Sequence, residues 1–264
     1  MPANKSKTTK VISVTNQKGG VGKTTTTINL AAALSQLQKK VLIIDLDPQG
    51  NASNGLDVEV EDRELSTYEF LVEGVPLEKV TMQTVISGLN IVPPTIDLSS
   101  ADIDLISNEK RSHLLHAALR KKQQDKQKYD YILIDCPPSL NILTVNAMVA
   151  SHSVLIPLQS EFFALEGLSQ LLLTVKEVRQ TANENLRVEG IVLTMFDGRN
   201  NLSKQVEADA RSNLRELVFK TIIPRNVRVS EAPSYSMPVL TYDPSSKGSK
   251  AYMSLAKELL ANNS

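Results

Sequence analysis

Short apolar runs alternate with helix-like stretches along almost the whole chain. The runs are rich in β-branched and aliphatic residues, whereas the stretches between them place apolar residues three and four positions apart. The strand-like runs are Val11–Thr15, Val41–Asp45, Leu89–Val92, Tyr131–Asp135, Val154–Leu158 and Ile191–Thr194, and the helix-like stretches are Thr24–Gln38, Glu109–Gln124, Asn141–Val149, Ala164–Thr181 and Leu202–Leu217.

Apolar strands separated by helices predict an α/β fold, a mostly parallel twisted sheet with helices on both faces. Ligands of such sheets bind beyond the carboxyl ends of the strands, so polar residues at those ends are the candidates for chemistry. No internal repeat or low-complexity linker interrupts the pattern. We therefore expect a flexible N-terminal tail, residues 1–9, followed by one domain, residues 10–264.

A glycine-rich loop follows the first strand. Residues Gln17–Thr25 read QKGGVGKTT and lead into a predicted helix. Glycines let backbone N–H groups turn inward around phosphate oxygens, and the helix N-terminus adds the positive end of its dipole. The pattern predicts that Lys23 reaches the β- and γ-phosphates and that the Thr24 hydroxyl ligates Mg²⁺. An additional lysine, Lys18, suggests a phosphate in a facing subunit, because a loop that wraps one nucleotide needs only one such lysine.

Two aspartates stand at the end of the second strand. Asp45 and Asp47 are two residues apart, so both carboxylates would point to one face, toward a metal–phosphate centre. Asp47 lies just beyond the apolar run, where a loop would place it to orient attacking water. For Asp45, the sequence leaves a role at that centre and a structural role at the strand end equally open.

The fourth strand delivers a third aspartate, Asp135, at its tip. This is the Walker B arrangement, in which the carboxylate holds Mg²⁺ directly or through water, opposite the threonine of the phosphate loop. Pro137 and Pro138 stiffen the chain immediately after it. The neighbouring Cys136 is interpreted as a small buried residue, because nothing nearby in the sequence would activate it as a nucleophile.

Composition and charge narrow the class of protein. The chain has 264 residues, 41% of them hydrophobic, and a formal net charge of zero, so binding to nucleic acid or membranes would need a local patch. A single cysteine excludes a disulfide framework and fits a reducing compartment. The N-terminus is polar, and no run approaches the roughly 18 apolar residues of a membrane span. The sequence thus indicates a soluble, cytoplasmic protein.

Two further features invite interpretation. The stretch Asp57–Glu78 holds eight acidic residues and one basic residue, Arg63, and is interpreted as a solvated surface insertion, with a partner surface as the alternative. His113 and His116 would share a helix face, but no third metal ligand is evident beside them.

The motifs together resemble a known family. Gln17–Thr25, Asp45–Asn51 and Ile132–Ser139 are similar to the three nucleotide motifs of the deviant Walker A ATPases. Gln159–Gly167 and Ile223–Ser234 are more specific, and with them the chain resembles the ParA/Soj partition ATPases, particularly the small chromosomal type. The similarity runs from about Lys10 to the C-terminus.

The resemblance implies a P-loop ATPase fold and slow, Mg²⁺-dependent ATP hydrolysis by an ATP-sandwich homodimer. Lys18 would reach the partner's phosphates, Lys23 would act in its own subunit, and Asp47 would position the water. The expected catalytic set is Lys18, Lys23, Asp47 and Asp135, the metal set is Thr24, Asp47 and Asp135, and the residues that bind ATP or ADP are Lys18, Gly19, Gly20, Val21, Gly22, Lys23, Thr24, Thr25, Pro224, Arg225 and Asn226. The loop Pro224–Val227 would lie against the adenine.

The resemblance also implies non-specific binding to double-stranded DNA, nucleoid association, and a ParB-like centromere-binding partner that stimulates hydrolysis. The candidate DNA contacts are Arg199, Lys204, Arg211, Arg225 and Arg228. Arg199 and Arg228 match positions through which Soj-like proteins hold DNA. Such binding would fall steeply with salt, and dimerisation would double the patch. For Lys204 and Arg211, simple solvation is an equally open interpretation. The short segment before the first strand leaves no room for a helix-turn-helix.

Related ATPases serve other ends, so two alternatives stay open. A MinD-like, membrane-associated division-site ATPase would need a basic amphipathic final helix. The stretch Ala251–Ala261 has an apolar stripe but few cations, which favours packing on the core and no membrane contact. A metabolic ATPase of the same superfamily is disfavoured by the Arg225–Ser234 motif. The sequence does not distinguish chromosome from plasmid cargo.

Overall fold

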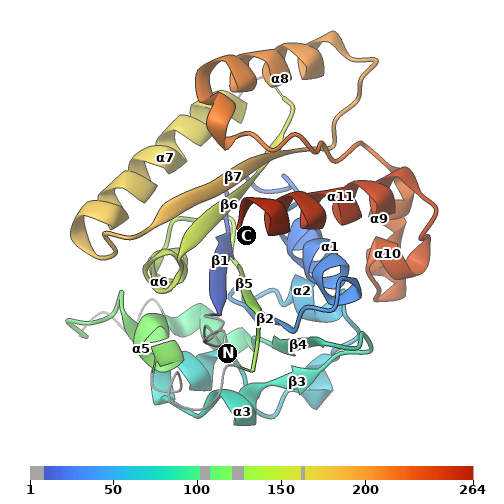
Figure 1. Ribbon diagram of the computed structural model, residues 1–264. Helices are drawn as coiled ribbons and strands as arrows, with labels where there is room; N and C mark the ends of the chain where they lie inside the picture. Colours follow the sequence, from blue (N-terminus) through green and yellow to red (C-terminus); the bar gives the residue numbers. More distant parts are fainter. Residues whose placement is uncertain (1–8, 102–107, 121–127, 162–163, 264) are drawn as a thin grey trace, which may run out of the picture.

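The computed structural model describes residues 9–101, 108–120, 128–161 and 164–263 (Figure 1). Within them, seven strands form one sheet in the order β3-β4-β2-β5-β1-β6-β7. The strands are β1 Lys10–Val14, β2 Val41–Asp45, β3 Met82–Gln83, β4 Leu89–Val92, β5 Tyr131–Asp135, β6 Ser153–Gln159 and β7 Arg187–Thr194. All neighbours pair in parallel except β3 and β4.

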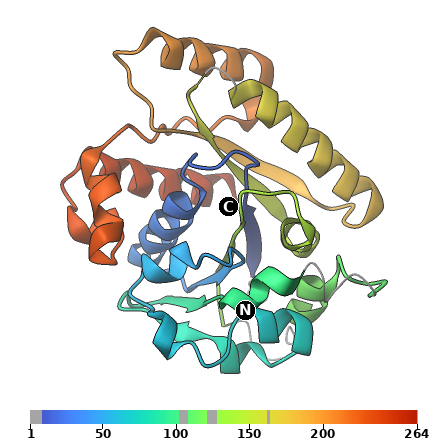
Figure 2. The same ribbon diagram turned by 180° about the vertical axis from the view of Figure 1, so that it is seen from behind.

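Helices cover both faces of this sheet (Figures 1 and 2). The longer helices are α1 Lys23–Gln36, α5 Leu114–Arg120, α6 Ile142–Ala150, α7 Ala164–Thr181, α8 Asn201–Leu214 and α11 Lys247–Asn262. Shorter segments are α2 Asn51–Asn54, α3 Leu77–Val80, α9 Val227–Glu231, α10 Val239–Tyr242, η1 Val60–Asp62, η2 Glu69–Glu73, η3 Ile96–Ser100, η4 Arg215–Leu217 and η5 Ala232–Tyr235. This architecture confirms the predicted α/β fold.

Alternation along the strands divides the core between the two faces. Ile43 packs with α1 and α11, whereas its neighbours Leu42 and Ile44 pack with α5, α6 and η2 on the other face. A third cluster joins β6 and β7 to α7 and α8. Because both faces are covered, the strands are nearly continuous apolar runs, which is why the sequence marked them so clearly.

Helix α1 lies between the sheet and α11. Its Ala31, Ala32 and Ala33 are at most 1% exposed, so small side chains allow close packing on both sides. Across from it, Tyr252 of α11 is 1% exposed and its hydroxyl lies 3.5 Å from Thr26 Oγ1. Leu255 and the other apolar residues of α11 are buried in the same cluster, which confirms that the final helix packs on the core. No helix in the described ranges is both long and apolar enough to span a membrane.

Several predicted boundaries were wrong. The stretch Glu109–Gln124 begins with turns and becomes helix α5 only at Leu114, while its end, residues 121–127, lies outside the described part. The stretch Leu202–Leu217 leaves the α-helix at Leu214 and finishes in the 3₁₀ turn η4. Strand β7 begins at Arg187, four residues before the predicted start at Ile191. The prediction began too late because Glu189 and Gly190 interrupt the apolar run.

The sequence suggested that Asp57–Glu78 is a solvated surface insertion, but only part of this stretch is exposed. Five of its acidic side chains are exposed, from Asp57 to Glu64. Phe70 and Leu71, however, are at most 3% exposed and pack beneath the sheet with Leu42 and Ile44. Averaging the charge over the stretch concealed apolar residues that alternate with the acidic ones.

The central position of α1 generates a stability prediction. Leu34 is fully buried between the sheet and α11, so Leu34→Ala should lower the free energy of unfolding by about 2–5 kcal/mol. Leu173 on α7 is 58% exposed, and Leu173→Ala should change it by less than about 0.5 kcal/mol. Urea unfolding followed by circular dichroism measures both, and equal effects would contradict the described packing.

Candidate nucleotide site

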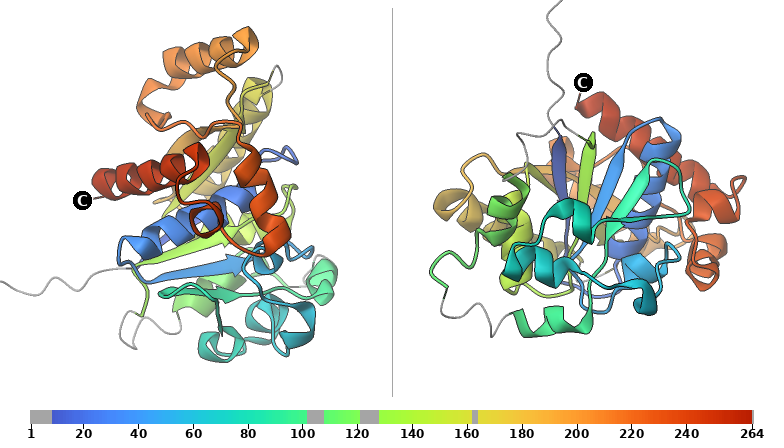
Figure 3. Two further views of the ribbon diagram at one scale, coloured as in Figure 1. Left: turned by 90° about the vertical axis from the view of Figure 1, so that its right-hand side faces the viewer. Right: turned by 90° about the horizontal axis from the view of Figure 1, so that it is seen from below.

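Three neighbouring strands bring the predicted site residues together. Asp135 at the end of β5 pairs in register with Val14 of β1 on one side and with Asp45 of β2 on the other. The loop after β1 is the glycine-rich loop, so this loop and the two aspartates meet at the carboxyl edge of the sheet. Figure 3 shows that the end of α11 lies at the opposite edge, where the strands begin.

The glycine-rich loop has the backbone that its sequence predicted. Gly20 and Gly22 have φ values of 74° and 87°, in the left-handed region that favours glycine. Thr194 Oγ1, at the end of β7, donates to Val21 O at 2.8 Å and ties the loop to that strand. Helix α1 begins at Lys23, directly after the loop. The loop therefore presents its N–H groups and the helix N-terminus to one cavity.

Lys23 and Asp135 are both buried and lie within one charge cluster. Lys23 is 7% exposed and its Nζ donates to Lys18 O at 3.2 Å; burial lowers the pKa of the ammonium, and the negative charge of Asp135 opposes that change. Asp135 is fully buried and accepts hydrogen bonds of 2.8 Å from Thr24 Oγ1 and from Thr27 Oγ1. Burial raises the pKa of Asp135 to about 6, although the two threonines oppose the rise.

Asp45 faces its own loop. Its carboxylate accepts the Asp47 N–H at 3.1 Å, the Ser53 N–H at 3.1 Å and the Ser53 hydroxyl at 3.0 Å. It is fully buried, and burial together with the charge of Asp135 raises its pKa to about 8. Of the two interpretations that the sequence left open, these contacts favour the structural one, in which Asp45 orders the segment that carries Asp47.

Asp47 lines a cavity of about 490 Å³ together with Lys23, Thr24 and Thr25. Asp47 is 8% exposed, and one of its carboxylate oxygens accepts the Gln49 N–H at 3.0 Å. The structure thus brings together the phosphate-loop residues and Asp47 around one space, as the sequence predicted. The loop residues Gly19, Gly20 and Gly22 line the same cavity, and Val21 is buried behind it.

Lys18 contacts a different partner. Its ammonium lies 2.7 Å from Glu161 Oε2, and its side chain is 41% exposed. Gln159 Nε2 donates to the other oxygen of Glu161 at 2.5 Å, which fixes that carboxylate at the end of β6. The Lys18 side chain is therefore held by its own chain at the edge of the site.

Pro224, Arg225 and Asn226 do not line the cavity. Asn226 Oδ1 accepts the Val229 N–H at 3.3 Å and caps α9, and Pro224 forms a bridge with Phe196. Met195, Pro233 and Met237 form the apolar wall instead, which sequence reasoning missed. Pro233 lies inside the Ile223–Ser234 motif, but no local signal marks the two methionines.

The candidate DNA contacts lie on two parts of the structure, the joined loops that carry Arg199 and Arg225 and the helix α8 that carries Lys204 and Arg211. Arg199 follows β7, and the Arg225 N–H donates to Phe196 O at 2.9 Å, so the loops that carry Arg199 and Arg225 are joined. Lys204 is exposed on the first turns of α8. Arg211 lies about two turns further along α8, about 10 Å beyond Lys204 at 1.5 Å per residue, and pairs with Glu207 at 2.9 Å.

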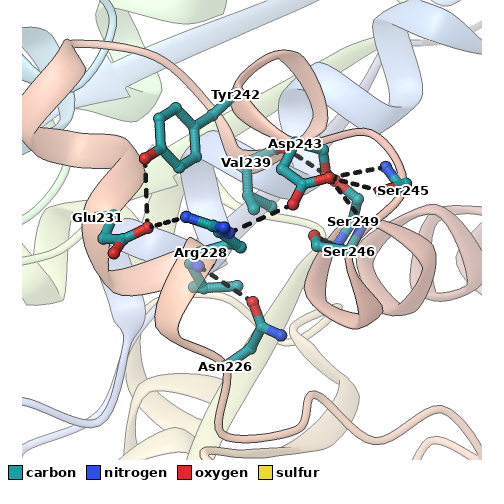
Figure 4. A network of polar contacts seen from close by, with 10 residues as sticks. Asn226, Arg228, Glu231, Val239, Tyr242, Asp243, Ser245, Ser246 and Ser249 are labelled. Atoms are coloured by element: carbon teal, nitrogen blue, oxygen red, sulfur yellow. Dashed lines mark hydrogen bonds and ion pairs between the residues drawn. The ribbon is translucent and has the colours of Figure 1, made fainter.

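Carboxylates of the same chain also hold Arg199 and Arg228. Both Nε and Nη2 of Arg199 donate to Asp197, at 3.0 and 2.9 Å, and these hydrogen bonds lower the pKa of Asp197 to about 2. Arg228 lies 2.8 Å from Glu231 and 3.4 Å from Asp243. Figure 4 shows the Arg228 guanidinium between these two carboxylates. The Tyr242 hydroxyl donates to the same Glu231 oxygen at 3.2 Å.

Comparisons with known proteins place this site in context. A family profile described as an AAA domain matches residues 9–188. The chain is 50% identical over 253 residues to the sporulation initiation inhibitor protein Soj of Bacillus subtilis, which covers 96% of this chain and 99% of that protein. It is also 49% identical over 252 residues to the chromosome partitioning protein ParA of Caulobacter vibrioides. This match covers 96% of this chain and 94% of that protein.

A solved structure shares the fold. Cobyrinic acid a,c-diamide synthase from Mycobacterium smegmatis, with bound ADP and magnesium, has a TM-score of 0.82 and 36% sequence identity, covering 96% of this chain and 94% of that one. This likeness confirms the predicted P-loop fold, and the two sequence relatives carry the names of the family that the motifs resemble.

The buried Asp45 generates a prediction about pH. Its pKa is about 8 in the folded protein and about 3.8 without the fold, so between these values the folded protein keeps a proton that the unfolded chain releases. Without nucleotide and Mg²⁺, the free energy of unfolding should therefore fall as pH rises through this window, by at most about 1.4 kcal/mol per pH unit for one proton.

Asp45→Asn should make this fall shallower in urea unfolding between pH 5 and 8. The exposed Asp57 offers a matched control, because Asp57→Asn should leave the slope as it is in the unaltered protein. A slope that Asp45→Asn does not change would show that the raised pKa of this carboxyl is wrong.

Proposed function

The chain belongs to the Soj/ParA family of chromosome-partitioning ATPases, and from this premise we propose that it is a DNA-segregation switch whose ATP-bound homodimer holds DNA non-specifically. The observation that carries the proposal is the shared end of β7. Thr194 bonds the phosphate loop, Met195 lines the cavity, and Phe196 bonds the arginine-bearing loop at Arg225. Nucleotide and DNA contacts would therefore meet at one strand end.

ATP, ADP and Mg²⁺ are the ligands we propose for the cavity. Thr24, Asp47 and Asp135 would hold the metal, and the phosphate loop from Lys18 to Thr25 would hold the phosphates. The site fits a divalent cation because its oxygen ligands converge: Thr24 and Asp47 line the cavity, and the Thr24 hydroxyl donates to Asp135. In the described residues, no three His, Cys, Asp or Glu side chains are placed to hold a metal unaided, so Thr24 and phosphate oxygens would complete its ligands. Bound Mg²⁺ would neutralise phosphate charge.

The chain's own groups would perform the remaining steps. Lys23 Nζ now donates to Lys18 O, and it would donate to phosphate oxygens when nucleotide enters. Asp47 would accept a hydrogen bond from the attacking water and orient it. The Met195, Pro233 and Met237 wall would cover the apolar part of the nucleotide, whereas the Pro224–Val227 loop would reach the adenine only after moving toward the cavity. Hydrolysis would be slow because the catalytic constellation is completed by a second subunit.

Lys18 would supply that second-subunit contact. It lies at the edge of the site, and its side chain is 41% exposed, so a facing subunit could approach it. To do so it would exchange Glu161 for a phosphate oxygen. This exchange makes dimerisation dependent on a bound triphosphate.

DNA would be held by the arginines on the joined loops. Arg199, Arg225 and Arg228 are exposed, and Arg199 and Arg228 would exchange their own carboxylates for DNA phosphates. Such contacts read no base sequence. Lys204 lies near this patch, and the remote, paired Arg211 would contribute less. A ParB-like partner would stimulate hydrolysis and release the dimer from the nucleoid, in the cytoplasm.

DNA binding is the first test of this proposal. A random-sequence duplex should be bound with ATP but not with ADP or without nucleotide, and affinity should fall steeply between 50 and 200 mM salt, by about 10³-fold or more for six or more phosphate contacts. Arg228→Ala removes one contact per subunit, so it should weaken binding and reduce the slope of log affinity against log salt by about 2 per dimer.

Arg179→Ala, on the exposed face of α7, is the matched control and should bind as the unaltered protein does. If the unaltered protein ignores DNA in every nucleotide state, the partition function falls. If Arg179→Ala and Arg228→Ala weaken binding equally, the assigned patch is wrong.

Dimerisation is the second test. With a non-hydrolysable ATP analogue, sedimentation should show a dimer, and Lys18→Ala should stay monomeric while it still binds the analogue through Lys23. Lys176→Ala, an exposed lysine on α7, should dimerise normally. A Lys18→Ala dimer of unchanged stability would exclude the proposed contact across the interface.

A further inference from the structure

Arg63 is an unusual member of the acidic stretch. It is the only basic residue from Asp57 to Glu78, and it is 8% exposed, while the acidic residues on either side of it, Asp62 and Glu64, are exposed. An arginine is rarely buried to this extent unless its guanidinium is paired with other groups. Its burial draws attention to what the guanidinium touches.

The guanidinium donates three hydrogen bonds to described residues, and all three go to neutral acceptors. Nη1 donates to Pro94 O at 3.2 Å, and Nη2 donates to Val58 O at 2.6 Å and to Asn54 Oδ1 at 2.5 Å. Among the residues that the structure describes, Nε has no hydrogen-bond partner. Burial lowers the pKa of Arg63, and the charges of Asp45, Glu59 and Glu61 oppose this change. These contacts clamp backbone and amide groups, unlike a surface ion pair.

The guanidinium also lies close to Gly50, in the turn after Asp47. A Cβ at Gly50 would stand 2.7 Å from Nη1, so only glycine permits this approach, and its φ of 63° favours glycine as well. The Gly50 N–H donates to Asp47 O at 2.8 Å and closes the turn, and the Asn54 N–H donates to Gly50 O at 3.0 Å. Arg63 thus contacts both ends of helix α2, its N-cap Gly50 and its last residue Asn54, within the segment Asp47–Asn54.

That segment forms one side of the nucleotide cavity. Asp47, Asn51, Asn54 and Gly55 all line it. On the strand side, the segment is held by Asp45 through Ser53. On the outer side, its contacts are those with Arg63 described above. Without the guanidinium, the turn after Asp47 would lose its outer support while the phosphate loop, which packs elsewhere, would keep its own.

We propose that Arg63 is a positioning residue for ATP hydrolysis, which holds the Asp47–Asn54 segment so that the Asp47 carboxylate faces the phosphate loop. The inference rests on the proposed ATPase function of this cavity. It concerns the rate of the chemical step and not the binding of nucleotide, because Lys23 and the glycines are positioned without Arg63.

Steady-state hydrolysis tests it. Arg63→Met should lower kcat by about 10- to 100-fold, the scale of a displaced catalytic group, and change KM for ATP by less than about threefold. Arg63→Lys should retain an intermediate kcat. Arg63→Ala should regain activity when guanidinium ions are added at concentrations far below those that unfold the protein. Arg179→Met, at the exposed α7 position, is the matched control and should behave as the unaltered protein.

A merely structural role predicts another pattern. If Arg63→Met lowers activity only in proportion to the unfolded fraction, or raises KM as much as it lowers kcat, and guanidinium does not restore Arg63→Ala, the proposal is overturned. If the unaltered protein does not hydrolyse ATP, the proposed function fails separately. Hydrogen exchange then decides on Arg63: faster exchange of residues 46–55 in Arg63→Met than in Arg179→Met supports the clamp, and equal exchange refutes it.

Discussion

Three carboxyl groups and one ammonium group are buried close together at the carboxyl edge of the sheet, and the surrounding segments are arranged to satisfy them. Asp45 and Asp135 are fully buried in register on adjoining strands, and Asp47 and Lys23 are nearly so. Unpaired charges at such depth would cost several kcal/mol each. The threonines of α1 donate to Asp135, and Ser53 of α2 donates to Asp45, so the hydrogen bonds that satisfy these buried carboxyl groups also attach the helices to the sheet.

This arrangement explains which parts of the site could be predicted from the sequence. β2, β4 and β5 matched their predicted bounds because both faces of each strand are buried, so the apolar run and the strand are the same residues. Lys23, Thr24 and Asp135 follow from local patterns, since glycine spacing and a strand tip are written in consecutive residues. These three residues meet at one edge of the sheet because parallel strands place their carboxyl ends together.

The remaining features depend on contacts between residues far apart in the chain. Met195 and Met237 reach the cavity from two segments that no local signal links, and Arg63 looks in the sequence like one more charge in a polar stretch. Lys18 was predicted to reach another subunit, whereas its present partner, Glu161, comes from the end of β6. Ion pairs of exposed side chains leave little trace in sequence, because many partners serve equally well on a surface.

The strand order of the sheet has a consequence for folding during synthesis of the chain. Strand β1, which carries the phosphate loop at its end, lies between β5 and β6, so both of its neighbours come from residues 131–135 and 153–159. Chains emerge from the ribosome N-terminus first. A nascent chain therefore holds the complete glycine-rich motif long before it holds the strands that support it. The motif that is easiest to recognise in the sequence must wait for more than half of the chain to be synthesised before it can take its shape.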